Sequence, residues 1–252
     1  MTQVKNIFIL GSGRSGTSML AGLFRDCQIN LGENSYQPRE SNPKGFFEDR
    51  EINAINEELL KPYLPERQSR NGVLYNADSP VNGQRWLARI PLSENISLTP
   101  DIEPNLLALV KRSPFCYKDP RFCYTLHLWR EFAGPSKFIC IFRNPAEVVS
   151  SILKEVTSMP YLKNLALSVD QAYEVWKLMY LRILEIHSKT GEWLFVDYKQ
   201  LFTSEGLSRV ERFSGLPIDR SFPDKKLNRS PALEHIDNEA LRLYSILSEK
   251  SG

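Results

Sequence analysis

The sequence has no long hydrophobic run and no strong excess of charge of either sign. Its first apolar run, residues 7–10, is too short for a membrane span or a signal-peptide core, so we expect no membrane span and a cytoplasmic location. Lys and Arg number 32 against 30 Asp and Glu, a formal net charge of +2. This balance gives no global field that favours nucleic acid or an anionic membrane as partner. A bound anion therefore requires a local cluster of residues.

Cysteine and histidine are also scarce. The four cysteines show no pair spacing that suits zinc, and the sequence contains only three histidines. Cys116 and Cys140 lie in apolar runs of strand length, where an unpaired cysteine packs as a small hydrophobic residue. We therefore expect buried free thiols and no bound metal.

Apolar runs of strand length alternate with helical patterns along the chain. The runs cover residues 6–10, 114–117, 137–142 and 193–196. Apolar residues spaced three or four apart predict helices around residues 20–27, 52–63, 172–186 and 233–247. This alternation predicts a three-layer α/β/α fold, in which a central parallel sheet binds ligands at the carboxyl ends of its strands.

The composition fits one large core. Because 42% of the 252 residues are hydrophobic and 25% are charged, we expect a single α/β domain over residues 1–252. Residues 61–104 differ from the rest, since they are rich in Pro, Asn, Ser and Gly and have weak periodicity. We expect this segment to form loops and short helices over the site.

A glycine loop, Gly11–Ser18, follows the first predicted strand and runs into a helical pattern. Such a loop offers successive backbone N–H groups and a helix amino end to phosphate. Four residues separate Gly11 from Gly16, as in the nucleotide-triphosphate loop, but Thr17 stands where that loop has lysine. The loop also matches G-x-G-x-x-G, with Glu33 about twenty residues further on. A kinase or NTPase, a dinucleotide-binding unit and a tight turn without ligand all remain open from the loop alone.

A second candidate anion site follows the apolar run 137–142. Arg143 ends this run, Asn144 can cap a helix, and Pro145 suits the first helical turn. Ser151 comes eight residues after Arg143, two turns into that helix. Arginine offers a planar fork for phosphate oxygens, and serine adds one donor. The alternative is an arginine paired with a surface carboxylate and a serine that faces solvent.

Both elements resemble those of sulfotransferases that use 3′-phosphoadenosine 5′-phosphosulfate. In that family a loop with a cation at the position of Arg14 grips the 5′-phosphosulfate, and an Arg…Ser pair binds the 3′-phosphate. The resemblance extends to residues 42–56, 117–129 and 196–201, and it points to a bacterial-type branch that acts on small molecules or carbohydrates. It implies a P-loop NTPase-like fold, with residues 61–104 as an insertion at the acceptor site.

The resemblance also implies a set of cofactor contacts. Tyr198 contacts the adenosine, and Arg229 closes over the phosphates. The full set is Gly11, Ser12, Gly13, Arg14, Ser15, Gly16, Thr17, Ser18, Arg143, Ser151, Tyr198 and Arg229. The cofactor is 3′-phosphoadenosine 5′-phosphosulfate, and its product is adenosine 3′,5′-bisphosphate.

Sulfuryl transfer to a hydroxyl or amine proceeds by in-line attack on sulfur and depends on positioning and electrostatics. Arg14 and Lys118 are the candidate groups that stabilise the sulfuryl oxygens without a metal. The candidate bases are Glu33, Glu40 and Glu48. We favour Glu48, because a predicted helix start holds a carboxylate toward the strand ends.

The remaining assignments concern the acceptor and the alternatives. Glu40, Asp119 and Arg121 are candidate acceptor contacts. His127 is an alternative base, although its sequence context favours a helix residue packed beside the core. A P-loop kinase with Asp197 as metal-binding carboxylate and a nucleotide-binding module without catalysis are the rival functions. The acceptor's identity and the oligomeric state remain open.

Overall fold

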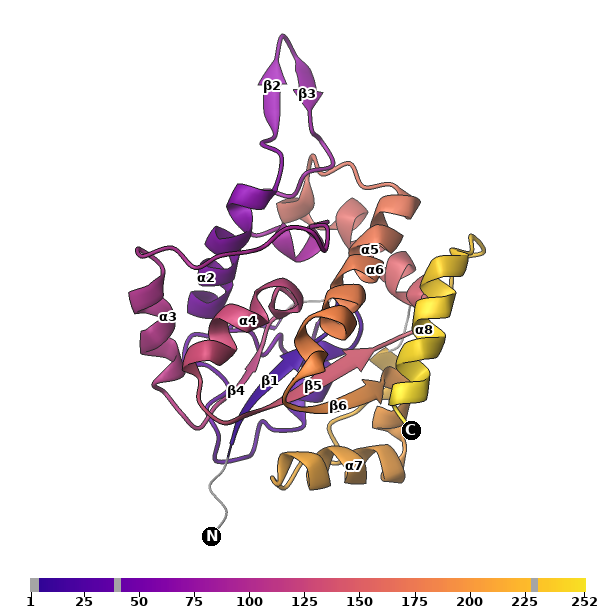
Figure 1. The fold of residues 1–252 in the computed structure, drawn as a ribbon. Helices are drawn as coiled ribbons and strands as arrows, with labels where there is room; N and C mark the ends of the chain where they lie inside the picture. The colour runs from indigo at the N-terminus through magenta and orange to yellow at the C-terminus, as the bar shows by residue number, and fades with distance from the viewer. Residues whose placement is uncertain (1–4, 39–41, 228–230) are drawn as a thin grey trace.

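A four-stranded parallel sheet lies at the centre of the computed structural model, which describes residues 5–38, 42–227 and 231–252 (Figure 1). The strands run in the order β4-β1-β5-β6. Their bounds are β1 (Asn6–Leu10), β4 (Cys116–Lys118), β5 (Ser136–Phe142) and β6 (Glu192–Asp197). All four expected strands are present, although β4 begins two residues later than predicted. The parallel sheet is confirmed.

Helices cover both faces of this sheet. Along β1, Phe8 and Leu10 point into one hydrophobic core, while Ile7 and Ile9 point into the other. The first core is covered by α2 (Arg50–Leu60), α3 (Glu103–Val110), α4 (Phe122–Phe132), α5 (Pro145–Ser158), α6 (Val169–Glu185) and α8 (Asn238–Lys250). The second is covered by α1 (Thr17–Gly22) and α7 (Ser204–Ser214). The predicted three-layer, P-loop NTPase-like α/β/α fold is confirmed.

Capping residues set the helix starts near the strand ends. The Asn144 side chain accepts a hydrogen bond from the amide of Ala146, 3.0 Å away, and Pro145 occupies the first turn of α5, as predicted. Helix α2 begins at Arg50, because Asp49 is its N-cap and accepts from the amide of Glu51 at 2.7 Å. The helix therefore starts two residues after Glu48.

Other boundaries differ from the sequence prediction. Helix α1 ends at Gly22 rather than near residue 27, and α8 begins only after Asp237, whose carboxylate caps it. The apolar spacing in the sequence did not indicate α3 or α7. The remaining short helices are η1 (Lys61–Tyr63), η2 (Arg85–Leu87), η3 (Pro160–Leu162), η4 (His187–Lys189), η5 (Tyr198–Phe202) and η6 (Lys225–Leu227).

The segment 61–104 contains short helices, as expected, and also an unpredicted hairpin. Its strands β2 (Gln68–Arg70) and β3 (Val73–Tyr75) pair with each other and project from the body (Figure 1). The three residues of β3 are all exposed. Because neither face of this strand is buried, its sequence does not alternate between apolar and polar residues, and the hairpin was not predicted.

Two features of composition have structural counterparts. Cys116, Cys123 and Cys140 are buried, Cys27 is half-buried, and all four thiols are free, as expected.

Over the described ranges, no helix has the length and apolar character needed to cross a membrane.

The loop between β1 and α1 depends on a left-handed backbone. Gly16 has φ 96° and ψ 14°, and a Cβ at this position would lie 2.4 Å from Cδ2 of Tyr198. Both the dihedral angle and the close approach of the tyrosine ring therefore require glycine.

Gly16→Ala should lower the free energy of unfolding through two separate costs. A left-handed non-glycine residue costs about 1–2 kcal/mol, and the clash with Tyr198 adds about 1–3 kcal/mol of overpacking. Gly72→Ala is the matched control, because Gly72 has φ 76° and a methyl group added there would meet nothing within 4 Å. Urea denaturation of both variants measures the difference, and equal losses would rule out the Tyr198 contact as a separate cost.

Candidate active site at the strand ends

The carboxyl ends of the four strands meet beneath two adjoining cavities. The loop Gly11–Ser18 follows β1, Lys118 ends β4, Arg143 follows β5, and Tyr198 follows β6. The first has a volume of about 400 Å³ and is called the α5 cavity, because Ser151 and Lys154 of α5 line it. The second has a volume of about 370 Å³ and is called the α2 cavity, because Asn53 and Glu57 of α2 line it. The two cavities share Arg14, Thr17, Ser18, Asn42 and Glu155. A group bound in one cavity can therefore reach a group bound in the other.

The α5 cavity brings both predicted anion elements together. Arg143 is buried, its guanidinium lies 4.9 Å from the centroid of the Tyr198 ring, and its Nε donates to Glu147 at 2.6 Å. Ser151 is buried rather than facing solvent, and its Oγ accepts from Nε of Arg14 at 3.0 Å. The alternative to an anion site was an arginine paired with a carboxylate and a serine facing solvent. Arg143 does pair with a carboxylate, but Ser151 does not face solvent.

The lining of the α5 cavity is cationic. Its charged members are Arg14, Lys44, Arg143 and Lys154 on the positive side, with Glu155 as the acidic one. The first amides of a helix have no acceptor within the helix, and α1 starts at the wall of this cavity. The cavity therefore suits a ligand with several negative charges.

The inner half of the glycine loop is held by the protein itself. The hydroxyls of Ser12 and Ser15 lie 2.8 Å apart in the interior, and the amide of Ser12 donates to the hydroxyl of Tyr180 at 3.2 Å. Tyr180 in turn donates to the carbonyl of Ile141 at 2.8 Å. Gly11, Ser12 and Ser15 do not line either cavity, whereas the other residues of the loop do. Sequence reasoning missed Tyr180, because only the packing of α6 under the loop reveals its contact.

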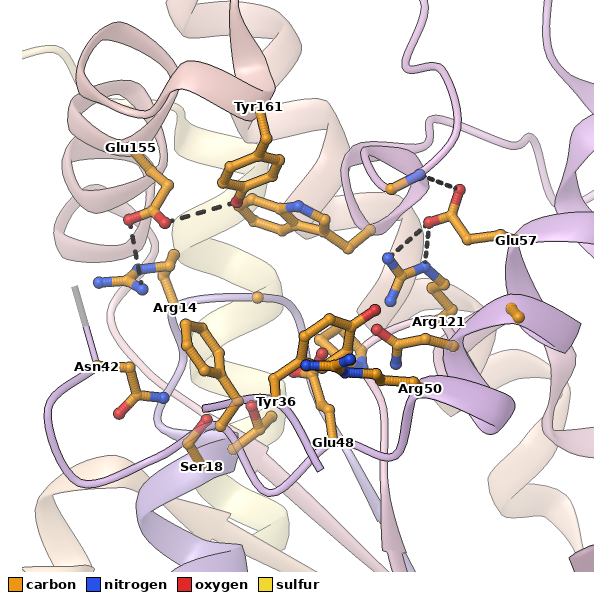
Figure 2. Close-up of a pocket in the computed structure, with 18 of the residues that line it drawn as sticks. Arg14, Ser18, Tyr36, Asn42, Glu48, Arg50, Glu57, Arg121, Glu155 and Tyr161 are labelled. Carbon is orange, nitrogen blue, oxygen red and sulfur yellow. Dashed lines mark hydrogen bonds and ion pairs between the residues drawn. The ribbon is translucent and has the colours of Figure 1, made fainter. Parts of the chain in front are cut away.

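Arg14 also lines the α2 cavity, whose lining residues are drawn in Figure 2. Trp86 from η2 packs on the loop so closely that a Cβ on Gly13 would lie 2.3 Å from its ring. Tyr36, Phe46 and Tyr161 add further rings to the wall, together with several amide side chains. Trp86 was not singled out in the sequence, since only the folding of residues 61–104 brings it to the loop.

Glu48 and Lys118 form an ion pair next to Ser18, which lines both cavities, while Lys118 itself lines neither. The Lys118 ammonium is fully buried and donates to a Glu48 carboxylate oxygen and to Oγ of Ser18, the latter at 3.2 Å. Burial lowers the pKa of Lys118, and the adjacent Glu48 carboxylate opposes this shift. Glu48 and Ser18 both line the α2 cavity. A carboxylate and an ammonium therefore lie side by side at the edge of the glycine loop.

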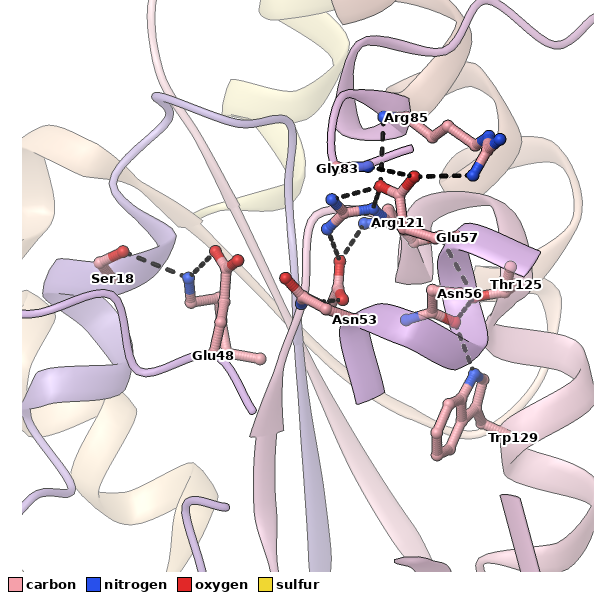
Figure 3. A network of polar contacts seen from close by, with 12 residues as sticks. Ser18, Glu48, Asn53, Asn56, Glu57, Gly83, Arg85, Arg121, Thr125 and Trp129 are labelled. Atoms are coloured by element: carbon pink, nitrogen blue, oxygen red, sulfur yellow. Dashed lines mark hydrogen bonds and ion pairs between the residues drawn. The ribbon is translucent and has the colours of Figure 1, made fainter. Parts of the chain in front are cut away.

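A buried network of charges supports the floor of the α2 cavity (Figure 3). Glu57 accepts from Nε of Arg121 at 2.6 Å, from a guanidinium nitrogen of Arg85 at 3.0 Å, and from the amide of Gly83 at 2.9 Å. Asp119 binds the Arg121 guanidinium at 3.1 Å and accepts from Asn53 at 2.6 Å. Two carboxylates thus balance two guanidinium groups. The cavity wall includes Arg121, whereas Asp119 lies behind it.

Three further candidate residues lie outside both cavity linings, namely Glu33, His127 and Asp197. Glu33 is exposed and lies 3.5 Å from a guanidinium nitrogen of Arg112, away from both linings. His127 lies in α4, where its Nε2 is 2.7 Å from the carbonyl of Ile96. The oxygens of Asp197 accept from the hydroxyl of Tyr244 and the amide of Lys199. Glu40 and Arg229 are outside the described residues.

Parallel α/β/α folds with a glycine loop after the first strand form a class of proteins that can hold a phosphate group at that loop. Within that class, a model of the Sulfotransferase family matches residues 6–220. The match covers most of the chain, which therefore belongs to the sulfotransferase family.

The chain is also similar to solved sulfotransferase structures. The chain is similar to a sulfotransferase from Alicyclobacillus acidocaldarius at 11% identity and a TM-score of 0.45, with 98% of this chain and 92% of that one covered. It is also similar to the sulfotransferase STF1 from Mycobacterium tuberculosis at 14% identity and a TM-score of 0.47, with 100% and 77% covered. Among curated proteins, no sequence gives a significant match.

Glu57→Gln should destabilise the protein by about 3–5 kcal/mol, because it leaves two buried guanidinium groups facing a single carboxylate. The control is Glu174→Gln, which removes a half-exposed carboxylate that pairs with Arg89 at 3.1 Å. That change should cost no more than about 1 kcal/mol. Urea denaturation compares the two variants. If Glu57→Gln costs no more than the control, the network does not stabilise the α2 cavity.

Proposed function

We propose that this sulfotransferase binds 3′-phosphoadenosine 5′-phosphosulfate in the α5 cavity and an acceptor in the α2 cavity. It transfers the sulfuryl group to a hydroxyl or amine of a small-molecule or carbohydrate acceptor. The observation that carries the proposal is the junction of the two cavities at Arg14, Thr17 and Ser18, beside the Glu48–Lys118 pair.

The cofactor's two anionic ends have separate partners in this proposal. Arg143 and Ser151 bind the 3′-phosphate, and Tyr198 packs on the adenosine. The cationic lining of the α5 cavity and the burial of Arg143 support this assignment. Arg14 and the amides at the start of α1 bind the 5′-phosphosulfate, which carries the group to be transferred.

The chemistry uses the residues at the junction. The acceptor oxygen or nitrogen attacks sulfur in line, its proton passes to Glu48, and the bond from sulfur to the bridging phosphate oxygen breaks. Lys118 and Arg14 stabilise the negative charge on the sulfuryl and leaving oxygens. Transfer of the acceptor proton to Glu48 leaves the Lys118 ammonium without its anionic neighbour, so that its charge is directed to the sulfuryl group.

The direct test is calorimetry with adenosine 3′,5′-bisphosphate, ATP and NAD in the presence of EDTA. We expect the bisphosphate to bind without a divalent metal, because Arg14 and the loop amides supply the positive charge. Preference for ATP with a strict magnesium requirement would favour the kinase. Binding without any turnover of the phosphosulfate would favour a nucleotide-binding module.

Arg143→Ala should weaken binding of adenosine 3′,5′-bisphosphate by roughly one to two decades. Loss of a charge-assisted hydrogen bond costs about 1.5–3 kcal/mol. The variant should also lose the parent's preference for adenosine 3′,5′-bisphosphate over adenosine 5′-phosphate. Arg143→Lys is the matched control, since it keeps the charge without the planar fork. Calorimetry with both nucleotides checks the assignment, which is wrong if Arg143→Ala retains the parent's preference.

Glu48→Gln should leave nucleotide affinity nearly unchanged and lower turnover by about 10²-fold or more, the usual scale for a lost general base. Release of adenosine 3′,5′-bisphosphate from the phosphosulfate measures turnover. Glu33→Gln is the control and should keep the parent rate, because Glu33 lies outside both cavities. Normal turnover by Glu48→Gln together with an inert Glu40→Gln would move the base to the preceding loop.

A further inference from the structure

Among the described residues, three carboxylates line the α2 cavity, and their partners differ. Glu48 pairs with the buried Lys118, and Glu57 accepts from two guanidinium groups. Glu155, from α5, lies farther from its partners, 3.5 Å from a guanidinium nitrogen of Arg14 and 3.5 Å from the Tyr161 hydroxyl. Its charge is therefore the least closely compensated of the three.

Glu155 also occupies a particular place between the cavities. Its side chain is only 7% exposed, yet it belongs to the lining of both cavities, and Figure 2 shows it above Arg14. A carboxylate has about four acceptor positions, so the two long contacts leave capacity for further donors. A nearly buried carboxylate is stable only with a compensating charge or donor.

An aromatic residue contacts this carboxylate. The Tyr161 hydroxyl donates to Glu155 at 3.5 Å, and Tyr161 and Trp86 line the same cavity as Glu155. Burial raises the pKa of Tyr161, and the Glu155 charge adds to the shift, so the hydroxyl stays protonated. Ring faces attract cations, and a carboxylate beside them adds a full counter-charge.

We propose that Glu155 binds an ammonium group of the acceptor, and that the enzyme therefore selects acceptors that carry a cationic amine. The proposal rests on the function proposed above and names the acceptor class for the same site. An ammonium supplies three donors and one positive charge, which a neutral hydroxyl does not. Glu155 acts in recognition, whereas Glu48 accepts the proton from the reacting group.

Arg14 makes this recognition depend on the cofactor. In the empty protein an ammonium at Glu155 would lie near the Arg14 guanidinium and be repelled by it. A bound phosphosulfate or bisphosphate supplies an anion to Arg14 and removes most of that repulsion. Amine acceptors should therefore bind after the nucleotide.

The experiment compares pairs of small probes that differ by one ammonium group. Tyramine is compared with 4-ethylphenol, and cyclohexylamine with cyclohexanol, by calorimetry on protein saturated with adenosine 3′,5′-bisphosphate. We expect each amine to bind about tenfold or more tightly than its neutral partner, as for a charge-assisted hydrogen bond. The amine should bind more weakly when the nucleotide is left out.

Glu155→Gln should abolish the preference for amines while the nucleotide still binds. Glu147→Gln is the matched control, because Glu147 lies on the same helix, pairs with Arg143 and lines neither cavity. This variant should keep the amine preference even if its nucleotide affinity changes. The control thus separates loss of an acceptor contact from a general change in the charge of α5.

Two results would overturn the inference. One is that the parent protein binds each amine no more tightly than its neutral partner, in both probe pairs. Failure to bind either probe of a pair counts as this result. The other is an amine preference that survives in Glu155→Gln. Failure of the parent to bind adenosine 3′,5′-bisphosphate is a different outcome, since it overturns the proposed function itself.

Discussion

The close packing around the loop between β1 and α1 is the constraint on which the site depends. Gly16 lies under the ring of Tyr198, Gly13 lies under Trp86, and Tyr180 holds the inner turn from below. These three aromatic residues come from η5, η2 and α6, so elements far apart in the sequence meet at one short loop. Because side chains fill the space on each of these sides, the loop residues Arg14, Thr17 and Ser18 point to the two cavities that remain.

The two cavities beside this loop differ in the charge of their surroundings. The α5 cavity has a cationic lining, and the network around Glu57 is balanced between carboxylates and guanidinium groups. The balanced network adds no net charge to the floor of the α2 cavity, because its two carboxylates pair with its two guanidinium groups. Of the two linings formed by the described residues, that of the α5 cavity is therefore the one that favours an anionic ligand. The proposed division between cofactor and acceptor depends on this difference.

The carboxylates near the junction show how environment separates similar groups. Glu48 lies beside a buried ammonium, Glu57 is enclosed by donors, and Glu155 lies between two cavities with only long contacts. Their chemical type is the same, so their different proposed roles in proton transfer, support and recognition come from their neighbours. The same principle applies to Glu33, whose exposure removes it from the site.

The sequence by itself determined the local features of this protein. Apolar runs of strand length predicted β1, β5 and β6, and the Asn144–Pro145 pair predicted the start of α5. The glycine loop, Arg143 and Ser151 were interpreted as one anion site, and the structure brings part of that loop to the cavity that both residues line. Tertiary structure alone decided the partners, namely Trp86 over Gly13, Tyr180 under Ser12, and Glu155 beside Arg14. Strands, caps and loops depend on residues close in sequence, whereas these contacts join positions tens of residues apart, and no local pattern records which distant side chains meet.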